Sequence, residues 1–414
     1  MGEHSYVIRG RLGQLRFGEG RTLLLKRLDI DLTERCNNGC IHCYINRPAD
    51  DLEALSRELS AEEVIDILHE AASLGCFTVR LTGGEPLLRD DFDEIYISAR
   101  KLGLAVIVAT NATLITPERA ALFARIPPLE KIEVSLYGMT QETYEAVSGI
   151  SGSYDAAMRG LHLLVTRQIP LVVITAFFPS LRDEEEEIVA LARSGLRWLD
   201  QSSSYTMLLD LRGRRDSEGK NRRIHKLRLP PEEAMRFFLR KKKDYLQEMR
   251  EFCSKFLEPP GDKLFSCGAG VKTGCVDAFG GFQLCLLLRH PDSVYDLKSG
   301  SLKDALMEFV PRIRDMRAKN AVYLVRCARC FLKSLCGQCP AKSWVEHGTL
   351  DSPVRYLCDL AQIQARYVGI LGEDEVPWDV TNWKDRIRHF VGSSEISPRS
   401  MPNKPLHHKT PSKC

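Results

Sequence analysis

The sequence predicts an α/β fold, in which a partial (β/α)6 TIM-like barrel is followed by a small cysteine-rich domain. Two observations predict the barrel: apolar segments alternate with amphipathic helices, and glycines or polar residues follow the segment ends. A third, a field of eight cysteines after residue 262, predicts the second domain. The expected strands are residues 23–31, 76–81, 104–109, 131–136, 170–177 and 198–207.

The helices between these strands carry recognisable start and stop signals. Ser60 and Glu63 fit a capping box, and Gly75 is placed to end the same helix. Thr116 followed by Pro117 predicts the start of another helix, because proline suits the first helical position. Strands alternating with helices pair in parallel through right-handed crossovers. We therefore expect a barrel open on one side, with its reactive site at the carboxyl ends of the strands.

The overall composition excludes several classes of protein. The chain has 414 residues, of which 44% are hydrophobic and 27% charged, with a formal net charge of +3. This charge is too small to indicate nucleic acid or a membrane surface as partner. No apolar run has the length of a membrane span, and the first residues lack a secretory signal, so a cytoplasmic protein is expected. Fourteen cysteines in that compartment favour metal ligation over disulfides.

A short segment after the first strand contains three cysteines. Cys36, Cys40 and Cys43 form the pattern C-x-x-x-C-x-x-C-Y, which ends in Tyr44. Three thiolates can hold three irons of a four-iron cube and leave the fourth iron open for chemistry. Half of a zinc site, or three unrelated buried cysteines, is the alternative from this segment alone.

The ends of the next strands supply small and polar residues to the same edge. The second strand runs into Thr82, Gly83, Gly84 and Glu85, followed by Pro86. Two glycines at a strand end permit a positive φ and a close approach of the backbone to a ligand. The third strand ends in Thr110-Asn111 and the fourth in Ser135-Leu136-Tyr137-Gly138. A simple turn would explain the glycines taken singly, but not their conjunction with the three-cysteine segment.

The later cysteine field contains two C-x-x-C pairs. Its members are Cys267, Cys275, Cys285, Cys327, Cys330, Cys336, Cys339 and Cys358. Eight cysteines make two sites of four, and both zinc and iron-sulfur clusters accept four thiolates. Cys76, Cys253 and Cys414 fall outside every pattern and are expected to be structural or incidental.

The first two motifs together resemble the radical S-adenosylmethionine (radical SAM) superfamily, over roughly residues 23–207. The resemblance implies that Cys36, Cys40 and Cys43 bind a 4Fe-4S cluster whose open iron is chelated by S-adenosylmethionine. It also implies that Thr82, Gly83, Gly84 and Glu85 contact the methionine amine. Tyr44 would lie near the adenine, and Ser135 would contact the ribose or carboxylate. His42 is read as packing beside the cluster ligands.

The later field resembles the SPASM domain, a cluster-binding extension of many radical SAM maturases. The resemblance implies two auxiliary 4Fe-4S clusters, the first on Cys267, Cys285 and Cys339, with Cys275 as fourth ligand. The second takes Cys327, Cys330, Cys336 and Cys358. One departure concerns Cys339, since the family usually has three residues between the fifth and sixth cysteines and this chain has two. Without Cys275 as a ligand, the first auxiliary cluster would have an open iron.

The resemblance implies an oxidoreductase that generates a 5′-deoxyadenosyl radical and takes hydrogen from a peptide or protein side chain, making a crosslink or an oxidised residue. A flavodoxin or ferredoxin would be the reductant. A sulfatase maturase is the alternative within the family, but that group has Asp where Leu286 follows Cys285. The alternatives of another class are a non-catalytic iron-sulfur electron carrier and a zinc-binding adaptor. The catalytic acid or base stays unassigned.

Five regions are expected from these patterns. A lead-in at 1–22 precedes the barrel at 23–229, a linker helix at 230–262, the SPASM domain at 263–371 and a C-terminal extension at 372–414. Residues 210–228 are expected to form a charged loop over the barrel mouth, and one amphipathic helix is expected to run to about Leu257. A short helical stretch is expected around Trp378 and Trp383, with disorder from about residue 392.

Overall fold

The structure, a computed structural model, describes residues 25–177, 184, 186–187, 190, 204–208, 211, 213, 217–239, 242–257 and 259–392. Contacts divide the chain into two compact units. Unit 1 comprises Met1–Arg228 and Cys267–Arg314, and unit 2 comprises Leu229–Ser266 and Asp315–Cys414. The predicted lead-in, most of the segment after the fifth strand and the tail beyond residue 392 lie outside the described residues.

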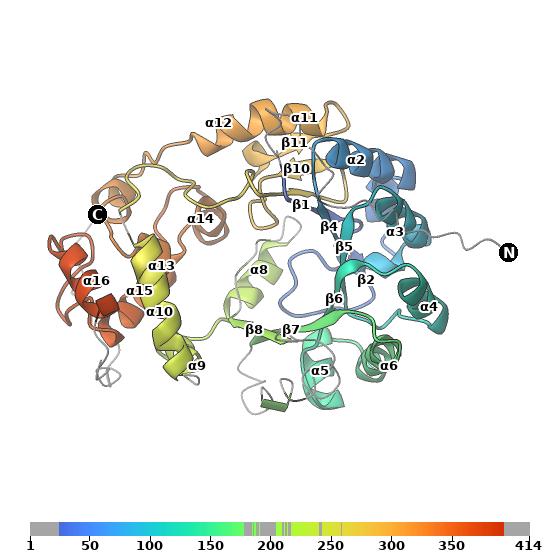
Figure 1. Ribbon diagram of the computed structural model, residues 1–414, viewed down its shortest axis with the longest axis horizontal. Coiled ribbons are helices and arrows are strands. Elements are labelled where there is room, and N and C mark those ends of the chain that lie inside the picture. The colour runs from blue at the N-terminus through green and yellow to red at the C-terminus, as the bar shows by residue number, and fades with distance from the viewer. Residues whose placement is uncertain are drawn as a thin grey trace. The chain divides into compact units, whose positions relative to one another are not determined.

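Unit 1 is built on a nine-stranded sheet with the order β11-β10-β9-β1-β4-β5-β6-β7-β8 (Figure 1). Parallel pairing runs from β9 through β1 to β8, and β10 and β11 are antiparallel. The strands are β1 (Arg27–Asp31), β4 (Thr78–Thr82), β5 (Ala105–Thr110), β6 (Leu129–Ser135), β7 (Leu171–Phe177), β8 (Ser204–Leu208), β9 (Thr273–Val276), β10 (Gly281–Gln283) and β11 (Tyr295–Asp296). All six predicted strands are confirmed, with their ends shifted by a few residues.

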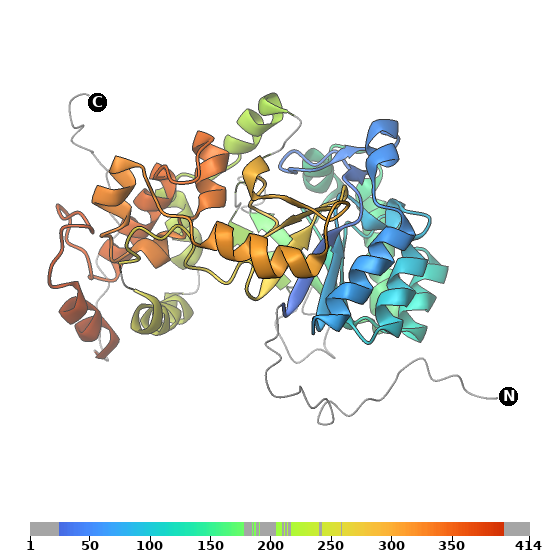
Figure 2. The same cartoon turned by 90° about the horizontal axis from the view of Figure 1, so that it is seen from above.

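The crossover helices lie along the outer side of this curved sheet (Figures 1 and 2). The capping box of Ser60 and Glu63 is present at the start of α2, and Thr116 caps α4 with Pro117 in its first turn. Gly75, with φ of +87°, follows the end of α2 as expected. The helices are α1 (Leu52–Arg57), α2 (Ala61–Ser73), α3 (Phe92–Lys101), α4 (Pro117–Arg125), α5 (Gln141–Ser148), α6 (Ser153–Thr166), α8 (Glu218–His225), α11 (Leu302–Asp304) and α12 (Val310–Arg314).

Alternate residues of β1 differ in character because successive side chains of a strand point to opposite faces. Leu28 and Ile30 are fully buried on one face, and Asp29 and Asp31 occupy the other. The same alternation places Arg80 of β4 and Glu133 of β6 on one cavity wall, joined by an ion pair of 2.7 Å. The concave face of the sheet is therefore polar, and the face toward the helices is apolar.

The division into units differs from the predicted domain boundaries. Residues 267–314 group with the barrel, because β9 pairs in parallel with β1 and carries β10 and β11 with it. The alternating apolar and polar residues of 273–283 form too short a pattern to show, from sequence alone, which sheet this segment joins. The predicted loop at 210–228 contains a helix, α8, whose N-cap is Ser217.

Unit 2 is mainly helical. Its helices are α9 (Pro231–Leu239), α10 (Lys242–Phe256), α13 (Lys333–Cys336), α14 (Pro340–His347), α15 (Arg355–Tyr367) and α16 (Trp383–Gly392), with a π-helical turn at Tyr323–Cys327. The single helix predicted up to Leu257 is two helices, α9 and α10. Their buried residues Met235, Tyr245 and Met249 pack with Phe331 and Ile363 in one apolar core. No helix among the described residues is long and apolar enough to cross a membrane.

Candidate functional site

The three-cysteine loop is closed at its base by two short strands. It leaves β2 (Arg35–Cys36) and returns through β3 (Arg47–Pro48), which pairs in parallel with β2. The backbone N–H groups of Gly39 and Ile41 donate to the carbonyls of Ser148 and Val147, at 2.7 and 3.0 Å. These two bonds hold the loop against the last turn of α5, so the spacing of the cysteines becomes a fixed geometry.

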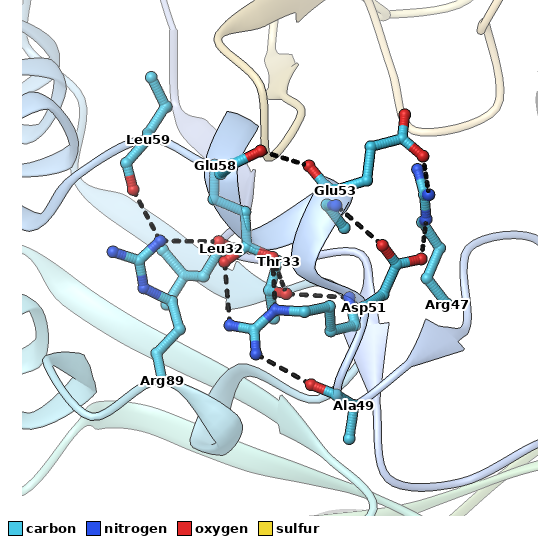
Figure 3. A network of polar contacts seen from close by, with 12 residues as sticks. Leu32, Thr33, Arg47, Ala49, Asp51, Glu53, Glu58, Leu59 and Arg89 are labelled. Carbon is cyan, nitrogen blue, oxygen red and sulfur yellow. Dashed lines mark hydrogen bonds and ion pairs between the residues drawn. The ribbon is translucent and has the colours of Figure 1, made fainter.

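A network of arginines and carboxylates holds the segment that leads into the loop (Figure 3). Arg35 makes two bonds to the Glu58 carboxylate, at 2.9 and 3.1 Å, and a third to the Ala49 carbonyl. The Thr33 hydroxyl also donates to Glu58. Arg89 donates to the carbonyls of Leu32 and Leu59. Both side chains of the Arg35–Glu58 pair are largely buried, and the hydrogen bonds that Arg35 donates to Glu58 raise the pKa of Arg35.

The glycine turn after β4 packs directly on this leading segment. Gly83 has φ of +132°, and a Cβ added there would lie 2.3 Å from the carbonyl oxygen of Thr33. A Cβ on Gly84 would lie 2.2 Å from the carbonyl oxygen of Arg35. The predicted positive φ is therefore confirmed, and the two absent side chains make room for protein backbone. Any other residue at either position would push the turn away from the cysteine loop.

Glu85 is fully buried and joins two strand ends. One carboxylate oxygen accepts from the Leu87 N–H and the Thr110 hydroxyl, at 3.1 and 2.8 Å. The other accepts from the Asn111 N–H at 2.8 Å. Burial raises the pKa of Glu85 to about 7, against the effect of these hydrogen bonds. The structure thus gives Glu85 a positioning role, and its expected contact with a methionine amine stays a prediction.

A cavity of about 340 Å³ brings the other predicted site residues together. Its walls include Cys36, Cys40, Cys43, Tyr44, Thr82, Gly83, Gly84 and Ser135. This volume is typical of small-molecule sites. His42 also lines it and packs edge-on against Tyr137, with ring centroids 4.7 Å apart, as its expected packing role requires. Asn111, whose side chain lies 3.8 Å from the Cys36 sulfur, completes the same wall.

The thiols of this loop are chemically suited to a cationic ligand. Burial raises the pKa of Cys36 and of Cys40, and the nearby Glu85 charge raises that of Cys36 further. The Asn38 N–H, 3.4 Å from the Cys36 sulfur, opposes this rise only in part. Such thiols ionise when a metal centre supplies positive charge. Among the described residues no group of three His, Cys, Asp or Glu is arranged for one metal ion. A site for a larger cluster needs its thiols farther apart.

Arg289 is a residue of this region that sequence reasoning missed. It is 1% exposed and pairs with Glu34 at 2.6 Å and, more loosely, with Asp31 at 3.9 Å. Its guanidinium lies 5.2 Å from the ring centroid of Tyr44, a member of the cavity wall. Burial raises the pKa of Asp31 to about 7, with Arg289 opposing the rise. No sequence pattern links Arg289 to Glu34, because 255 positions separate them.

The cysteines predicted for the first auxiliary cluster are divided between the units. Cys267, Cys275 and Cys285 belong to unit 1, and Cys339 belongs to unit 2. Cys275 lies in β9, opposite Asp29 of β1, and is 1% exposed. Burial and the charges of Asp31 and Asp29 raise its pKa. The grouping of these four cysteines as ligands stays a prediction.

A second cysteine-lined cavity, of about 510 Å³, lies within unit 2. Cys327, Cys330, Cys336 and Cys358 all line it. Cys339, three residues after Cys336, is instead the N-cap residue of α14 and is not part of this wall. Burial raises the pKa of Cys327, Cys336 and Cys358 to about 11. Four cysteines therefore line one cavity, and they are the four residues expected to bind one cluster.

The two described cysteines outside every pattern are buried apart from these cavities. Cys76, 6% exposed, precedes β4, and its sulfur contacts the carbonyls of Lys26 and Thr78. Cys253, 2% exposed, belongs to the apolar core of unit 2. Both are packing residues, as their exclusion from the motifs suggested. Cys414 lies outside the described residues.

Comparison with known proteins shows which family part of this chain is similar to. Residues 30–192 match the Radical SAM superfamily. The chain is 39% identical over 132 residues to Fe-coproporphyrin III synthase of Methanosarcina barkeri (strain Fusaro / DSM 804), which is 32% of each chain. It is 37% identical over 134 residues to mycofactocin maturase MftC of Mycolicibacterium smegmatis (strain ATCC 700084 / mc(2)155), covering 32% of this chain and 33% of that one.

These alignments span about a third of the curated relatives' length. A solved structure, Streptococcus suis SuiB bound to precursor peptide SuiA, is similar over a longer stretch. The similarity covers 81% of this chain and 76% of SuiB, with a TM-score of 0.61 and 17% sequence identity. At that identity the likeness concerns the fold. Fold, family match and the three-cysteine cavity agree: residues 30–192 form a radical SAM superfamily domain.

Proposed function

We propose that this chain is a radical SAM enzyme that modifies a side chain of a peptide or protein. The observation that carries the proposal is the single cavity shared by Cys36, Cys40 and Cys43 and the Gly83–Gly84 turn. When bound there, a 4Fe-4S cluster and S-adenosylmethionine supply a 5′-deoxyadenosyl radical that removes hydrogen from a substrate. The protein's part is to hold the reacting atoms in place and exclude water.

The residues present fit these two groups. The three cysteines line one cavity, and the raised pKa values of Cys36 and Cys40 mean that these two thiols ionise only beside a cation. Thr82 and Gly83 line the same cavity, and they are the candidates to accept hydrogen bonds from the amine of S-adenosylmethionine. Tyr44 and Ser135 lie on the same wall and are the candidates for contacts to adenine and ribose.

We extend the proposal to two auxiliary 4Fe-4S clusters. The cavity of unit 2 supports one of them, because its four cysteines are those that resemble the SPASM pattern. The other would use Cys267, Cys275, Cys285 and Cys339. Such centres would take up the electron left on the oxidised substrate, and a flavodoxin or ferredoxin would supply the electron that starts the reaction.

The substrate class rests on the kind of protein this chain resembles. SuiB is described in complex with a precursor peptide, and the mycofactocin relative is named a maturase. Fe-coproporphyrin III synthase shows that relatives over the same stretch also have other names and other products. Sulfatase-type maturation is disfavoured by Leu286, which cannot accept a proton. A pure electron carrier is disfavoured by a loop with three thiols in place of four.

Anaerobic reconstitution with iron and sulfide, followed by S-adenosylmethionine and dithionite, tests the proposal. We expect 5′-deoxyadenosine in the chromatogram of the parent protein and in that of Cys76→Ala, a buried cysteine outside the site. Cys36→Ala should give only background. Equal yields of 5′-deoxyadenosine from the parent and Cys36→Ala would refute the assignment as an enzyme.

A further inference from the structure

The sulfur atoms of the unit 2 cavity have two buried polar neighbours that need an explanation. Lys333 and Gln362 both line this cavity, and each is only 5% exposed. Burying an ammonium costs free energy unless an anion or strong acceptors replace its water. A buried lysine beside four thiols is thus a charge whose partner has to be identified.

Lys333 opens the short helix that ends in Cys336, so the two side chains lie three residues apart and share a helix face. Its ammonium donates to the Gln338 carbonyl and lies 5.8 Å from the Tyr323 ring centroid. In the described part of unit 2, none of the ion pairs joins Lys333 to a carboxylate. The four cysteines of the same cavity would supply the opposite charge once they bind a cluster as thiolates.

Gln362 donates its side-chain amide to the Cys358 sulfur at 3.1 Å, from one turn further along α15. Arg366 donates to the other end of the same amide, at 3.2 Å. Since a guanidinium can only donate, this contact fixes which end of the amide is oxygen and turns the NH2 group toward sulfur. Arg366 is itself held by the carbonyls of Gly372 and Glu375, at 3.2 and 3.3 Å. The amide is therefore oriented by a chain of contacts and not by chance.

We propose that Lys333 and Gln362 are positioning residues that raise the reduction potential of a cluster held by Cys327, Cys330, Cys336 and Cys358, making it an electron acceptor. This inference rests on the proposed function, which places a cluster there. Reduction adds one electron, and its negative charge spreads onto the sulfurs. A fixed positive charge and an N–H···S hydrogen bond both stabilise the reduced form more than the oxidised one.

The test measures the midpoint potentials of the auxiliary clusters by redox titration monitored by electron paramagnetic resonance. All proteins are full-length, reconstituted, and carry Cys36→Ala, Cys40→Ala and Cys43→Ala, so that the first site adds no signal. We expect Lys333→Met to make reduction of one centre at least tenfold less favourable, a fall of about 59 mV for one electron. Gln362→Met should lower the same midpoint by a smaller amount, and Lys333→Arg should restore most of the loss.

Arg388→Gln is the matched control, because it removes a cation from the same unit at a side chain that is 75% exposed. Its midpoints should equal those of the parent. Variants that lose iron or melt early but keep the parental midpoint would show that the residues are only structural, and would overturn the inference. Should Lys333→Met fail to fold, an unshifted midpoint in Gln362→Met overturns it equally.

A result that refutes the cluster itself can be distinguished from one that refutes only the tuning of its potential. Cys358→Ala should lower the iron content by about four atoms per chain, the content of one cube. Unchanged iron in that variant would refute the cluster itself, and the tuning proposal would fall with it. An altered iron content with unaltered midpoints in Lys333→Met would refute the tuning alone.

Discussion

The barrel cavity and the cavity of unit 2 differ both in their number of thiols and in the charges around them. The barrel cavity has three thiols, and after burial the Glu85 carboxylate is the strongest influence raising the pKa of Cys36. The cavity of unit 2 has four thiols, with Lys333 and the Gln362 amide beside them. The first arrangement disfavours added negative charge, whereas the second accommodates it.

This contrast assigns different tasks to the same kind of ligand. Three thiols leave an iron position open for a second molecule, and four thiols close the site. An anionic setting favours a centre that gives up its electron readily, and a cationic setting favours one that keeps it. In the proposed function, the barrel cavity would therefore be the donor site and the unit 2 cavity an acceptor site. The following predictions test this division, beginning with the largest expected effect.

Loss of one thiol from the barrel loop should abolish cofactor cleavage. In Cys40→Ala we expect 5′-deoxyadenosine formation to fall by about 100-fold or more, because a ligand matters at least as much as its supporting contacts. Product is measured by chromatography after anaerobic incubation. Cys253→Ala, which removes a buried thiol outside both cavities, should keep the parental rate. A comparable loss in both variants would point to general destabilisation.

Loss of one thiol from the unit 2 cavity should lower the iron content and leave cofactor cleavage nearly unchanged. Cys330→Ala should remove about four of about twelve iron atoms per chain, the content of three cubes. Its 5′-deoxyadenosine formation without substrate should stay within about twofold of the parent, since the barrel cavity is intact. Iron and product are measured on the same sample. A parental iron content near four would contradict both auxiliary clusters.

The arginine–carboxylate network beneath the barrel loop should be worth several kcal/mol. Glu58→Gln leaves Arg35 buried without its counter-ion, which we expect to lower the unfolding free energy by about 3 kcal/mol. Arg57→Ala breaks a surface pair whose side chains are 55% and 69% exposed, and should cost less than about 1 kcal/mol. Denaturant titrations of the two variants supply the comparison. Equal losses would mean that the buried network does not support the loop.

The buried carboxylates of the barrel should make unit 1 less stable as pH rises. The pKa of Asp31 is raised from 3.8 to about 7, so the folded state binds its proton more tightly than the unfolded chain does. The resulting stabilisation is complete below the unfolded value and is lost as pH rises through about 7. Asp31→Asn should therefore gain about 1 kcal/mol over the parent between about pH 6 and pH 8.

Denaturant titrations at several pH values measure this difference. The exposed Asp90 supplies the control, and Asp90→Asn should change the unfolding free energy by less than about 0.5 kcal/mol. A pH-independent difference between Asp31→Asn and the parent would show that Asp31 stays ionised in the folded protein.

The alternation of strands and helices in the barrel was predictable, because each element is signalled by neighbouring residues. A capping box at Ser60 and a proline at position 117 depend on neighbouring residues only, and both form as expected. The strand at residues 273–276 was not predicted, because its partner β1 lies more than two hundred positions earlier. Its inclusion in the sheet moves residues 267–314 into unit 1.

The cysteine loop and the glycine turn could be assigned to one site from sequence, since parallel strands bring their carboxyl ends to the same edge. The role of Glu85 at this site could not be assigned from the sequence. Its three donors come from Leu87, Thr110 and Asn111, and only the folded chain shows that the carboxylate is enclosed by them. Gly83 and Gly84 likewise proved to meet the backbone of Thr33 and Arg35.

The sequence by itself determined the ligand types and their order, because cysteine spacing and strand periodicity are properties of short segments. Only the tertiary structure decided the electrostatic environment of those ligands. Arg289 and Glu34 are 255 positions apart, and the Arg366–Gln362–Cys358 chain depends on the rotation of one helix. Charge acts through space over a few ångströms, so it becomes readable only when distant segments have been brought together.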